Sequence, residues 1–164
     1  MPRLTPGDRP FLDLAPVIVS TDVDMPATRD EVWAAIADNA SWTEWFVDCR
    51  VCDGRPQVWT EPGQTRRIEV GALKVDETAV ELVPGERWVM TLTRTNLIVA
   101  KRMVETLELF DTSTDDEVRT EVRFTAAIEF PAFVRPLQNL IAGRFIDAWG
   151  PSLENLSEYI ASTR

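Results

Sequence analysis

The fold of this chain is decided by residues 132–162, AFVRPLQNLIAGRFIDAWGPSLENLSEYIAS. Apolar side chains recur there at intervals of three and four residues over about eight turns, which is the pattern of one long amphipathic helix. The Trp149-Gly150-Pro151 segment predicts a kink, because proline removes a backbone hydrogen bond. The apolar positions are Phe133, Leu137, Leu140, Ile141, Phe145, Ala148, Trp149, Leu153, Leu156 and Ile160.

A different period, of two residues, runs through the chain before this helix. Alternating segments separated by turn residues predict six strands, and the short connections are typical of antiparallel hairpins. The predicted strands lie within residues 47–53, 65–73, 74–83, 86–95, 100–111 and 117–130.

The N-terminal part adds one strand and two short helices. Residues 17–23, VIVSTDV, alternate as a first strand does. Thr28 and Glu31 have the spacing of a capping box, which predicts that a helix begins there, and residues 41–46, SWTEWF, predict a second short helix. Residues 1–16 contain four prolines, and we expect a flexible lead before a single domain spanning residues 17–162.

Geometry turns this order of elements into a shape. Seven strands about 4.8 Å apart make a sheet roughly 33 Å wide, whereas one helix is only about 10–12 Å across. The sheet must therefore curl around the helix, and the space between them holds either side chains or a cavity. The sequence predicts an α+β fold in which a curled antiparallel sheet wraps a long C-terminal helix.

Composition narrows the classes of function. The chain has 164 residues, a net charge of −10 and no histidine. The negative charge disfavours nucleic acid as a partner, and the lack of histidine excludes histidine-centred triads and histidine-ligated metals. No apolar run approaches the roughly 18 residues of a membrane span. We expect a cytoplasmic protein with no cofactor and no metal ion.

The two cysteines, Cys49 and Cys52, have the C-x-x-C spacing of redox and zinc motifs. On an extended strand, however, side chains three residues apart point to opposite faces, with Cα atoms roughly 10 Å apart. That separation is too large for a disulfide. We therefore expect ordinary core or edge residues.

Two charged residues are candidates for the interior. Glu105 lies between Met103 and Leu107; if this face of the strand points inward, the carboxyl group is in apolar surroundings and its pKa is raised. The opposite face, with Val104, is nearly as apolar, so the alternative stays open. Arg144 falls within the apolar arc of the last helix. It would clamp a ligand carboxylate, neutralise Glu105 or extend to the surface.

Aromatic residues supply the remaining candidates. Trp33, Trp88 and Trp149 occupy periodic positions typical of a core, whereas Trp42, Trp45, Phe46 and Trp59 are either the rim of a pocket or a bulky plug. Glu105 is the only catalytic candidate. The residues expected to contact a ligand are Trp45, Phe46, Trp59, Trp88, Met90, Glu105, Leu107, Phe124, Leu137, Ile141, Arg144, Phe145 and Trp149.

An apolar hairpin tip is the last candidate. Leu97, Ile98 and Val99 are flanked by the basic residues Arg94, Lys101 and Arg102. Such a tip either touches a membrane or a donor protein transiently, or folds over the interior of its own domain.

Three segments carry a resemblance to a known superfamily. They are VWAAIADNASWTEWF (32–46), ELVPGERW (81–88) and GPSLENLSEYI (150–160). With the order of elements over residues 17–162, they resemble the SRPBCC superfamily, which includes START-type lipid carriers, the birch-pollen-allergen fold and the polyketide cyclase/dehydrase family. The resemblance implies a helix-grip fold over a cavity for lipids, polyketides or other apolar molecules.

Three functions are compatible with these observations. The first is binding or transport of a lipid-like or aromatic molecule in an internal cavity. The second is a polyketide aromatase/cyclase or dehydrase acting in the same cavity, which would need a poised acid or base. The third is a ligand-free interaction module with a closed core. The chain is expected to be a monomer or a homodimer.

Overall fold

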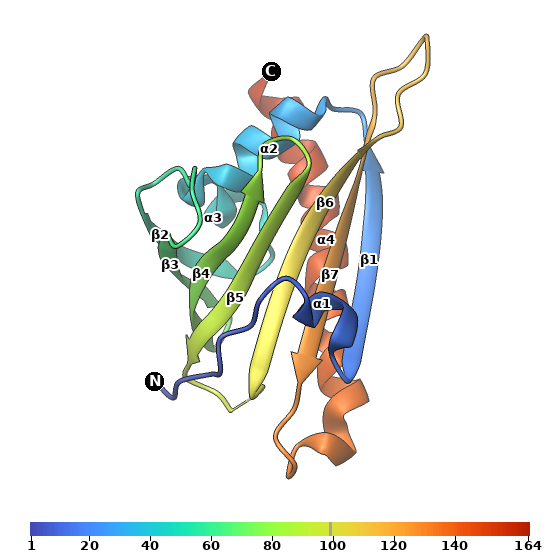
Figure 1. Ribbon diagram of the computed structural model, residues 1–164. Helices are drawn as coiled ribbons and strands as arrows, with labels where there is room; N and C mark the ends of the chain where they lie inside the picture. The colour runs from blue at the N-terminus through green and yellow to red at the C-terminus, as the bar shows by residue number, and fades with distance from the viewer. Residues whose placement is uncertain (99) are drawn as a thin grey trace.

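Within residues 1–98 and 100–164, which the computed structural model describes, seven strands form one antiparallel sheet in the order β1-β7-β6-β5-β4-β3-β2 (Figure 1). The strands are β1 (Val17–Met25), β2 (Cys49–Arg55), β3 (Thr65–Val70), β4 (Leu73–Val83), β5 (Arg87–Thr95), β6 (Arg102–Asp111) and β7 (Thr120–Glu129). The helical elements are α1 (Phe11–Leu14), α2 (Arg29–Ala37), η1 (Asn39–Ser41), α3 (Trp42–Trp45), η2 (Arg135–Leu137) and α4 (Gln138–Thr163). The predicted α+β helix-grip architecture is confirmed.

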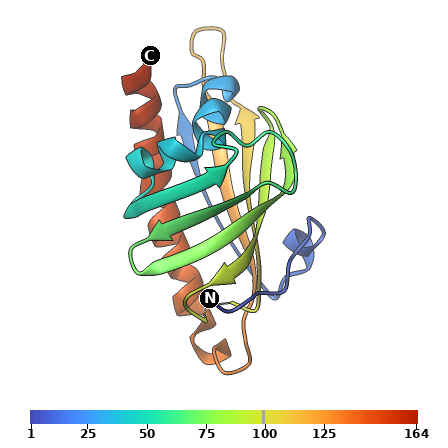
Figure 2. The ribbon, with the colours of Figure 1, turned by 90° about the vertical axis from the view of Figure 1, so that its left-hand side faces the viewer.

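The sheet curls around α4. Figure 2 shows β1 and β7 running along the helix, while β2, β3 and β4 cross its direction. The pairing of β4 with β5 shifts register between Asp76 and Glu77 and again between Ala79 and Glu81. Such irregularities increase the local twist of a strand. They therefore contribute to the curl of the sheet between β4 and β5.

The long helix differs from its predicted range at the start. Its first predicted residues form a turn and then η2, with Pro136 inside that short element, and α4 begins at Gln138. The helix then continues through Pro151. Leu153 and Leu156, beyond the proline, are fully buried against the sheet.

Both faces of β6 are buried, and they belong to different clusters. Met103 and Leu107 pack into the main core with Trp149, so of the two alternatives this is the face that points inward. Val104 points to the outer face and packs there with Phe11. The covered outer face explains why the two faces of this strand are almost equally apolar in sequence.

The N-terminal segment lies on that outer face. The N–H group of Leu4 donates to the carbonyl of Thr93 at 3.0 Å, and that of Thr5 donates to the carbonyl of Lys101 at 2.9 Å. Figure 1 shows the segment crossing in front of β5 and β6, with α4 behind the sheet. The flexibility of residues 1–16 stays a prediction, but their position covers apolar surface that would otherwise be exposed.

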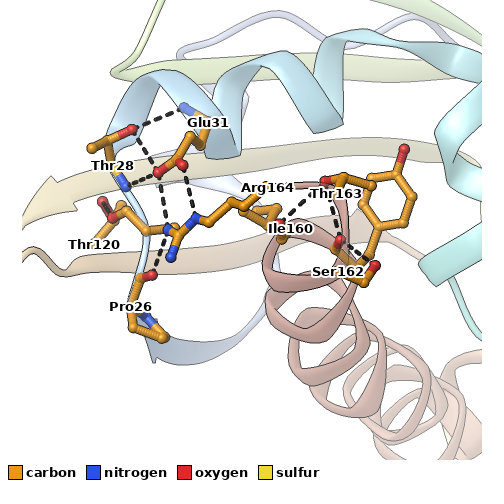
Figure 3. Close-up of polar contacts among 10 residues, drawn as sticks. Pro26, Thr28, Glu31, Thr120, Ile160, Ser162, Thr163 and Arg164 are labelled. Carbon is orange, nitrogen blue, oxygen red and sulfur yellow. Dashed lines mark hydrogen bonds and ion pairs between the residues drawn. The ribbon is translucent and has the colours of Figure 1, made fainter.

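The predicted capping box at the start of α2 is confirmed. The Thr28 hydroxyl accepts a hydrogen bond from the N–H group of Glu31 at 3.2 Å, and the Glu31 carboxylate accepts one from the N–H group of Thr28 at 2.8 Å. Arg164 extends this network, because its Nε donates to Glu31 at 2.8 Å and its Nη2 donates to the Pro26 carbonyl at 2.6 Å (Figure 3). The end of α4 is thereby fixed to the beginning of α2.

Candidate functional site

A cavity of about 350 Å³ lies between the concave face of the sheet and α4. Its polar lining comes from Glu77, Glu105 and Arg144. The apolar lining comes from Trp42, Phe46, Ile68, Val70, Leu73, Val75, Leu92, Leu97, Ile141, Phe145, Ala148 and Trp149. The site is therefore a mainly apolar pocket with few ionisable groups, the usual composition of a small-molecule site.

The cavity exists because α4 covers only part of the concave face. Among the strands, the helix packs mainly against β1, at one edge of the curled sheet. Alternate residues of β3 and β4, such as Ile68 and Val75, also point inward, but they face the cavity. One helix was expected to be too narrow to cover this sheet, and the uncovered part of the sheet leaves an open space beside β3 and β4.

Stacked aromatic rings form one wall of the cavity. Trp149 stacks on Phe124 with ring centroids 4.1 Å apart, and Phe46 meets Trp149 edge to face at 4.8 Å. Trp42 meets the same indole at 5.8 Å, with the rings perpendicular. Each ring is held by at least one other, so this wall is rigid and suited to contact a flat apolar molecule.

A buried arginine supports the wall from behind. Arg66 on β3 forms an ion pair with Glu77 on β4, with Nε and Oε2 2.6 Å apart, and the two residues are direct cross-strand partners. Its guanidinium carbon lies 3.7 Å from the ring centroid of Trp42 and 4.9 Å from that of Trp59. Its Nη1 donates to Asn39 at 3.3 Å. Burial alone would lower the pKa of Arg66, but the surrounding acidic groups, the Glu77 carboxylate foremost, together raise it.

Glu105 is the second buried carboxyl group of the cavity. It is only 5% exposed, and its cross-strand neighbours are Met90 on β5 and Ala126 on β7. Among the residues that the structure describes, none donates to or accepts from its side chain. Burial raises the pKa of Glu105 well above its usual value, and the charge of Glu77 raises it further, although Arg66 opposes both. The predicted carboxyl group in apolar surroundings is confirmed.

Arg144 lies at the mouth of the cavity. Its side chain is 77% exposed and forms an ion pair with Asp147 at 3.8 Å, one turn along α4. The structure does not show it neutralising Glu105, so that alternative is wrong. The physical reason is that a long arginine side chain at the edge of an apolar arc reaches water more cheaply than it enters the interior. Its contact with a ligand carboxylate stays a prediction.

The structure sorts the expected ligand contacts into three groups. The first group lines the cavity: Phe46, Glu105, Ile141, Arg144, Phe145 and Trp149. The second is buried in the core outside this lining: Trp45, Trp59, Trp88, Met90, Leu107 and Phe124. Leu137 is alone in the third, exposed group.

Two of the predicted rim residues, Trp45 and Trp59, are instead buried, as the alternative of a bulky plug predicts. Trp45 and Trp59 are each 1% exposed, and Trp59 stacks on Trp88 with centroids 5.2 Å apart. The indole of Trp45 donates to Ser41 at 3.0 Å. Trp42 and Phe46, by contrast, line the cavity.

Sequence reasoning missed the lining residues of β3, β4 and β5. These are Ile68, Val70, Leu73, Val75, Glu77 and Leu92. Alternation identified the strands but not the portion of the face that the helix leaves uncovered. Arg66 was also missed, although a signal was present: it alternates with Ile68 on the inward face of its strand.

The cysteines do not point to opposite faces, so that prediction is wrong. The pairing of β2 with β3 shifts register between Cys49 and Val51, and the extra residue turns both Cys49 and Cys52 toward the main core. Both thiols are free. Burial raises the pKa of Cys49, and it raises that of Cys52 to about 12. Neither thiol has the lowered pKa of a reactive cysteine.

A concave antiparallel sheet gripping one long helix over an apolar cavity defines the class of helix-grip proteins. More particularly, the chain belongs to the family described as polyketide cyclase/dehydrase and lipid transport, whose pattern matches residues 16–161. Membership supports a role connected with polyketides or other hydrophobic ligands. No curated protein matches the chain.

Solved structures show the same fold at low sequence identity. The protein XoxI from Bacillus cereus has 12% identity and a TM-score of 0.69, covering 88% of this chain and 96% of its own. MLL2253 from Mesorhizobium loti has 19% identity and a TM-score of 0.69, covering 90% and 99%. DynU16, a protein of the dynemicin biosynthetic locus, has 19% identity and a TM-score of 0.61, covering 90% of this chain and 48% of its own.

In the described ranges, 1–98 and 100–164, no helix is both long enough and apolar enough to cross a bilayer.

Proposed function

We propose that this protein binds a lipid-like or aromatic small molecule in the cavity and sequesters or carries it. The observation that carries this proposal is the apolar space of about 350 Å³ bounded by α4, β3 and β4. A ligand-free interaction module would not need such a space, because filling it with side chains would stabilise the domain.

The first test identifies what the protein holds. The purified protein is extracted with organic solvent and the extract is analysed by mass spectrometry. We expect an apolar molecule in stoichiometric amount, or binding of an added polyaromatic probe to the emptied protein. A clean extract from a protein that binds neither a fluorescent fatty acid nor a polyaromatic probe would contradict the proposal.

A pair of variants on α4 locates binding in the cavity. Ala148 lines the cavity, whereas Ala161 is exposed near the end of the same helix. Ala148→Phe should fill part of the space and weaken probe binding by about tenfold or more, since a misfit of even one methylene is felt in a packed site. Ala161→Phe should bind the probe as the unchanged protein does. Equal affinities for both variants would place binding elsewhere.

Catalysis on a polyketide is the second candidate function, and Glu105 is the observation that favours it. A buried carboxyl group with a raised pKa is suited to donate or accept a proton near neutral pH. Glu105→Gln should then abolish turnover of a poly-β-ketone while leaving its binding within a fewfold of the original. Turnover that survives this substitution would exclude Glu105 as the acid or base.

The mouth of the cavity is the basis for a further part of the proposal, transient contact with a membrane. Leu97 and Ile98 are exposed in the β5–β6 connection, and Phe133 and Leu140 are exposed near the start of α4. Figures 1 and 2 both place these two connections at the same end of the molecule. Val99, the third residue of the predicted tip, lies outside the described residues. Since Leu97 also lines the cavity, a ligand would pass from lipid to cavity without crossing water.

A further inference from the structure

We infer that the cavity selects neutral ligands that carry a hydrogen-bond acceptor, such as a ketone or ester carbonyl, and that Glu105 donates a hydrogen bond to this acceptor. The inference deepens the proposed function and rests on it, because it specifies the chemical class of the ligand that the cavity takes.

The first step is a balance of charge in the interior. The buried ionisable groups beside the cavity are one cation, Arg66, and two carboxyl groups, Glu77 and Glu105. Arg66 and Glu77 are in direct contact at 2.6 Å, so this carboxylate keeps its charge. A second buried carboxylate without a partner would be very costly, and such a group takes up a proton instead. Glu105 is therefore the protonated member of the set.

The second step concerns the hydrogen-bond donor that protonation creates. A neutral carboxyl group carries one O–H donor. The residues next to Glu105 along β6 and its cross-strand partners offer it no oxygen from their side chains: these are Met103 and Leu107 on β6, Met90 on β5 and Ala126 on β7. The nearby Glu77 carboxylate accepts from Arg66, and no hydrogen bond joins it to Glu105 in the described residues. Glu105 itself lines the cavity. A ligand carbonyl in the cavity would supply the missing acceptor.

The third step explains why an anionic ligand is disfavoured. A carboxylate in the cavity would meet the charge of Glu77 and would lose its hydration. Arg66 is already engaged by Glu77, Asn39 and the Trp42 ring. Arg144 is solvent-exposed at the mouth and paired with Asp147, so it offsets little of this cost.

Three matched probes test the inference: 2-methylnaphthalene, 2-acetylnaphthalene and 2-naphthoate, measured by equilibrium dialysis against the full chain. We expect the ketone to bind about tenfold more tightly than the methyl compound, as one well-made hydrogen bond in an apolar site allows. The naphthoate should bind at least tenfold more weakly than the ketone.

Two variants of Glu105 test whether its hydrogen-bond donor, and not the shape of the cavity, causes the preference for the ketone. Glu105→Leu should abolish the preference for the ketone while 2-methylnaphthalene binds as before or more tightly, which also shows that the cavity is intact. Glu105→Gln, which keeps a donor, should retain a preference for the ketone within about threefold of the original.

The outcomes distinguish this inference from the proposed function. A ketone preference that survives Glu105→Leu, or a naphthoate that binds more tightly than the ketone, would overturn the inference while leaving cavity binding in place. Failure of all three probes to bind the unchanged protein would overturn both.

Discussion

At the scale of single residues, Arg66 carries a charge on a side chain that is fully buried. A guanidinium group without access to water is stable only where a counter-charge and other partners replace its hydration. Glu77 supplies the charge, Asn39 a further acceptor, and the ring of Trp42 a polarisable face. Trp42 in turn lines the cavity, so the ion pair fixes the position of one wall.

Removing only one partner of this pair should therefore be far more damaging than removing both. Arg66→Met leaves the Glu77 carboxylate buried and unpaired, and we expect the free energy of unfolding to fall by about 3–5 kcal/mol. The double variant Arg66→Met/Glu77→Met should recover most of this loss, because methionine fills irregular space. Urea denaturation of the three proteins measures both effects.

The neighbouring Arg67 provides the control. It pairs with Asp76 at 2.7 Å, but its side chain is half exposed, so Arg67→Met should lower the free energy of unfolding far less than Arg66→Met does. If Arg66→Met and Arg67→Met had equal effects, the interior ion pair would not stabilise the fold as argued.

At the scale of helices and strands, the sequence predicted which elements form. It did not predict the register in which strands pair or where α4 lies across the sheet. The helical period of residues 138–163 and the capping box at Thr28 and Glu31 are local signals, since each depends on side chains within a few residues. Alternation located the strands for the same reason. The inward face of Glu105 was left open by alternation, because both faces of β6 are covered.

The register shift near Cys49 shows why the remainder could not be predicted. Whether Cys52 points inward depends on how β2 pairs with β3, and one extra residue reverses every side chain that follows it. The sequence of β2 contains no proline at the register shift that would have indicated it. The lining of the cavity was hidden for a related reason, since it depends on where α4 lies across the sheet.

The contact between the start of α2 and the end of α4 should make the stability of the fold depend on pH. Hydrogen bonds from Arg164 and from Thr28 lower the pKa of Glu31 from its ordinary value of 4.5 to about 2. A pKa lowered by folding adds stability above the unfolded pKa, and this stability is lost as pH falls from about 4.5 to about 2. Because both side chains are more than a third exposed, the contribution should not exceed about 1 kcal/mol.

Glu31→Gln is the variant that checks this. We expect it to lower the melting temperature at neutral pH by about 2–4 °C at most, and the difference from the unchanged protein should shrink toward zero near the lower end of the titration. Glu154→Gln, at an exposed position of α4, is the control and should show no such convergence. A Glu31→Gln difference that is constant with pH would contradict the assignment.

At the scale of the whole molecule, exposed apolar side chains in the β5–β6 connection and around the start of α4 share one end of a chain whose net charge is −10 (Figure 1). The basic residues near this end are largely neutralised, since Lys101 pairs with Glu129 at 2.6 Å and Arg94 lies 3.9 Å from Asp76. Contact with a membrane should therefore depend on inserted apolar side chains more than on attraction to anionic lipids, and it should vary little with salt.

Vesicle sedimentation with and without anionic lipid tests this last prediction. Ile98 is 56% exposed in the β5–β6 connection and Phe133 is 71% exposed between β7 and α4, whereas Val118 is 52% exposed in the β6–β7 connection at the opposite end (Figure 1). Ile98→Asp and Phe133→Asp should each reduce the bound fraction by about tenfold or more, since each removes the burial of a large apolar side chain. Val118→Asp should have no effect, although it adds the same charge. Equal losses for all three variants would show that charge alone governs binding. Sedimentation unchanged by Ile98→Asp would exclude this connection as the membrane contact.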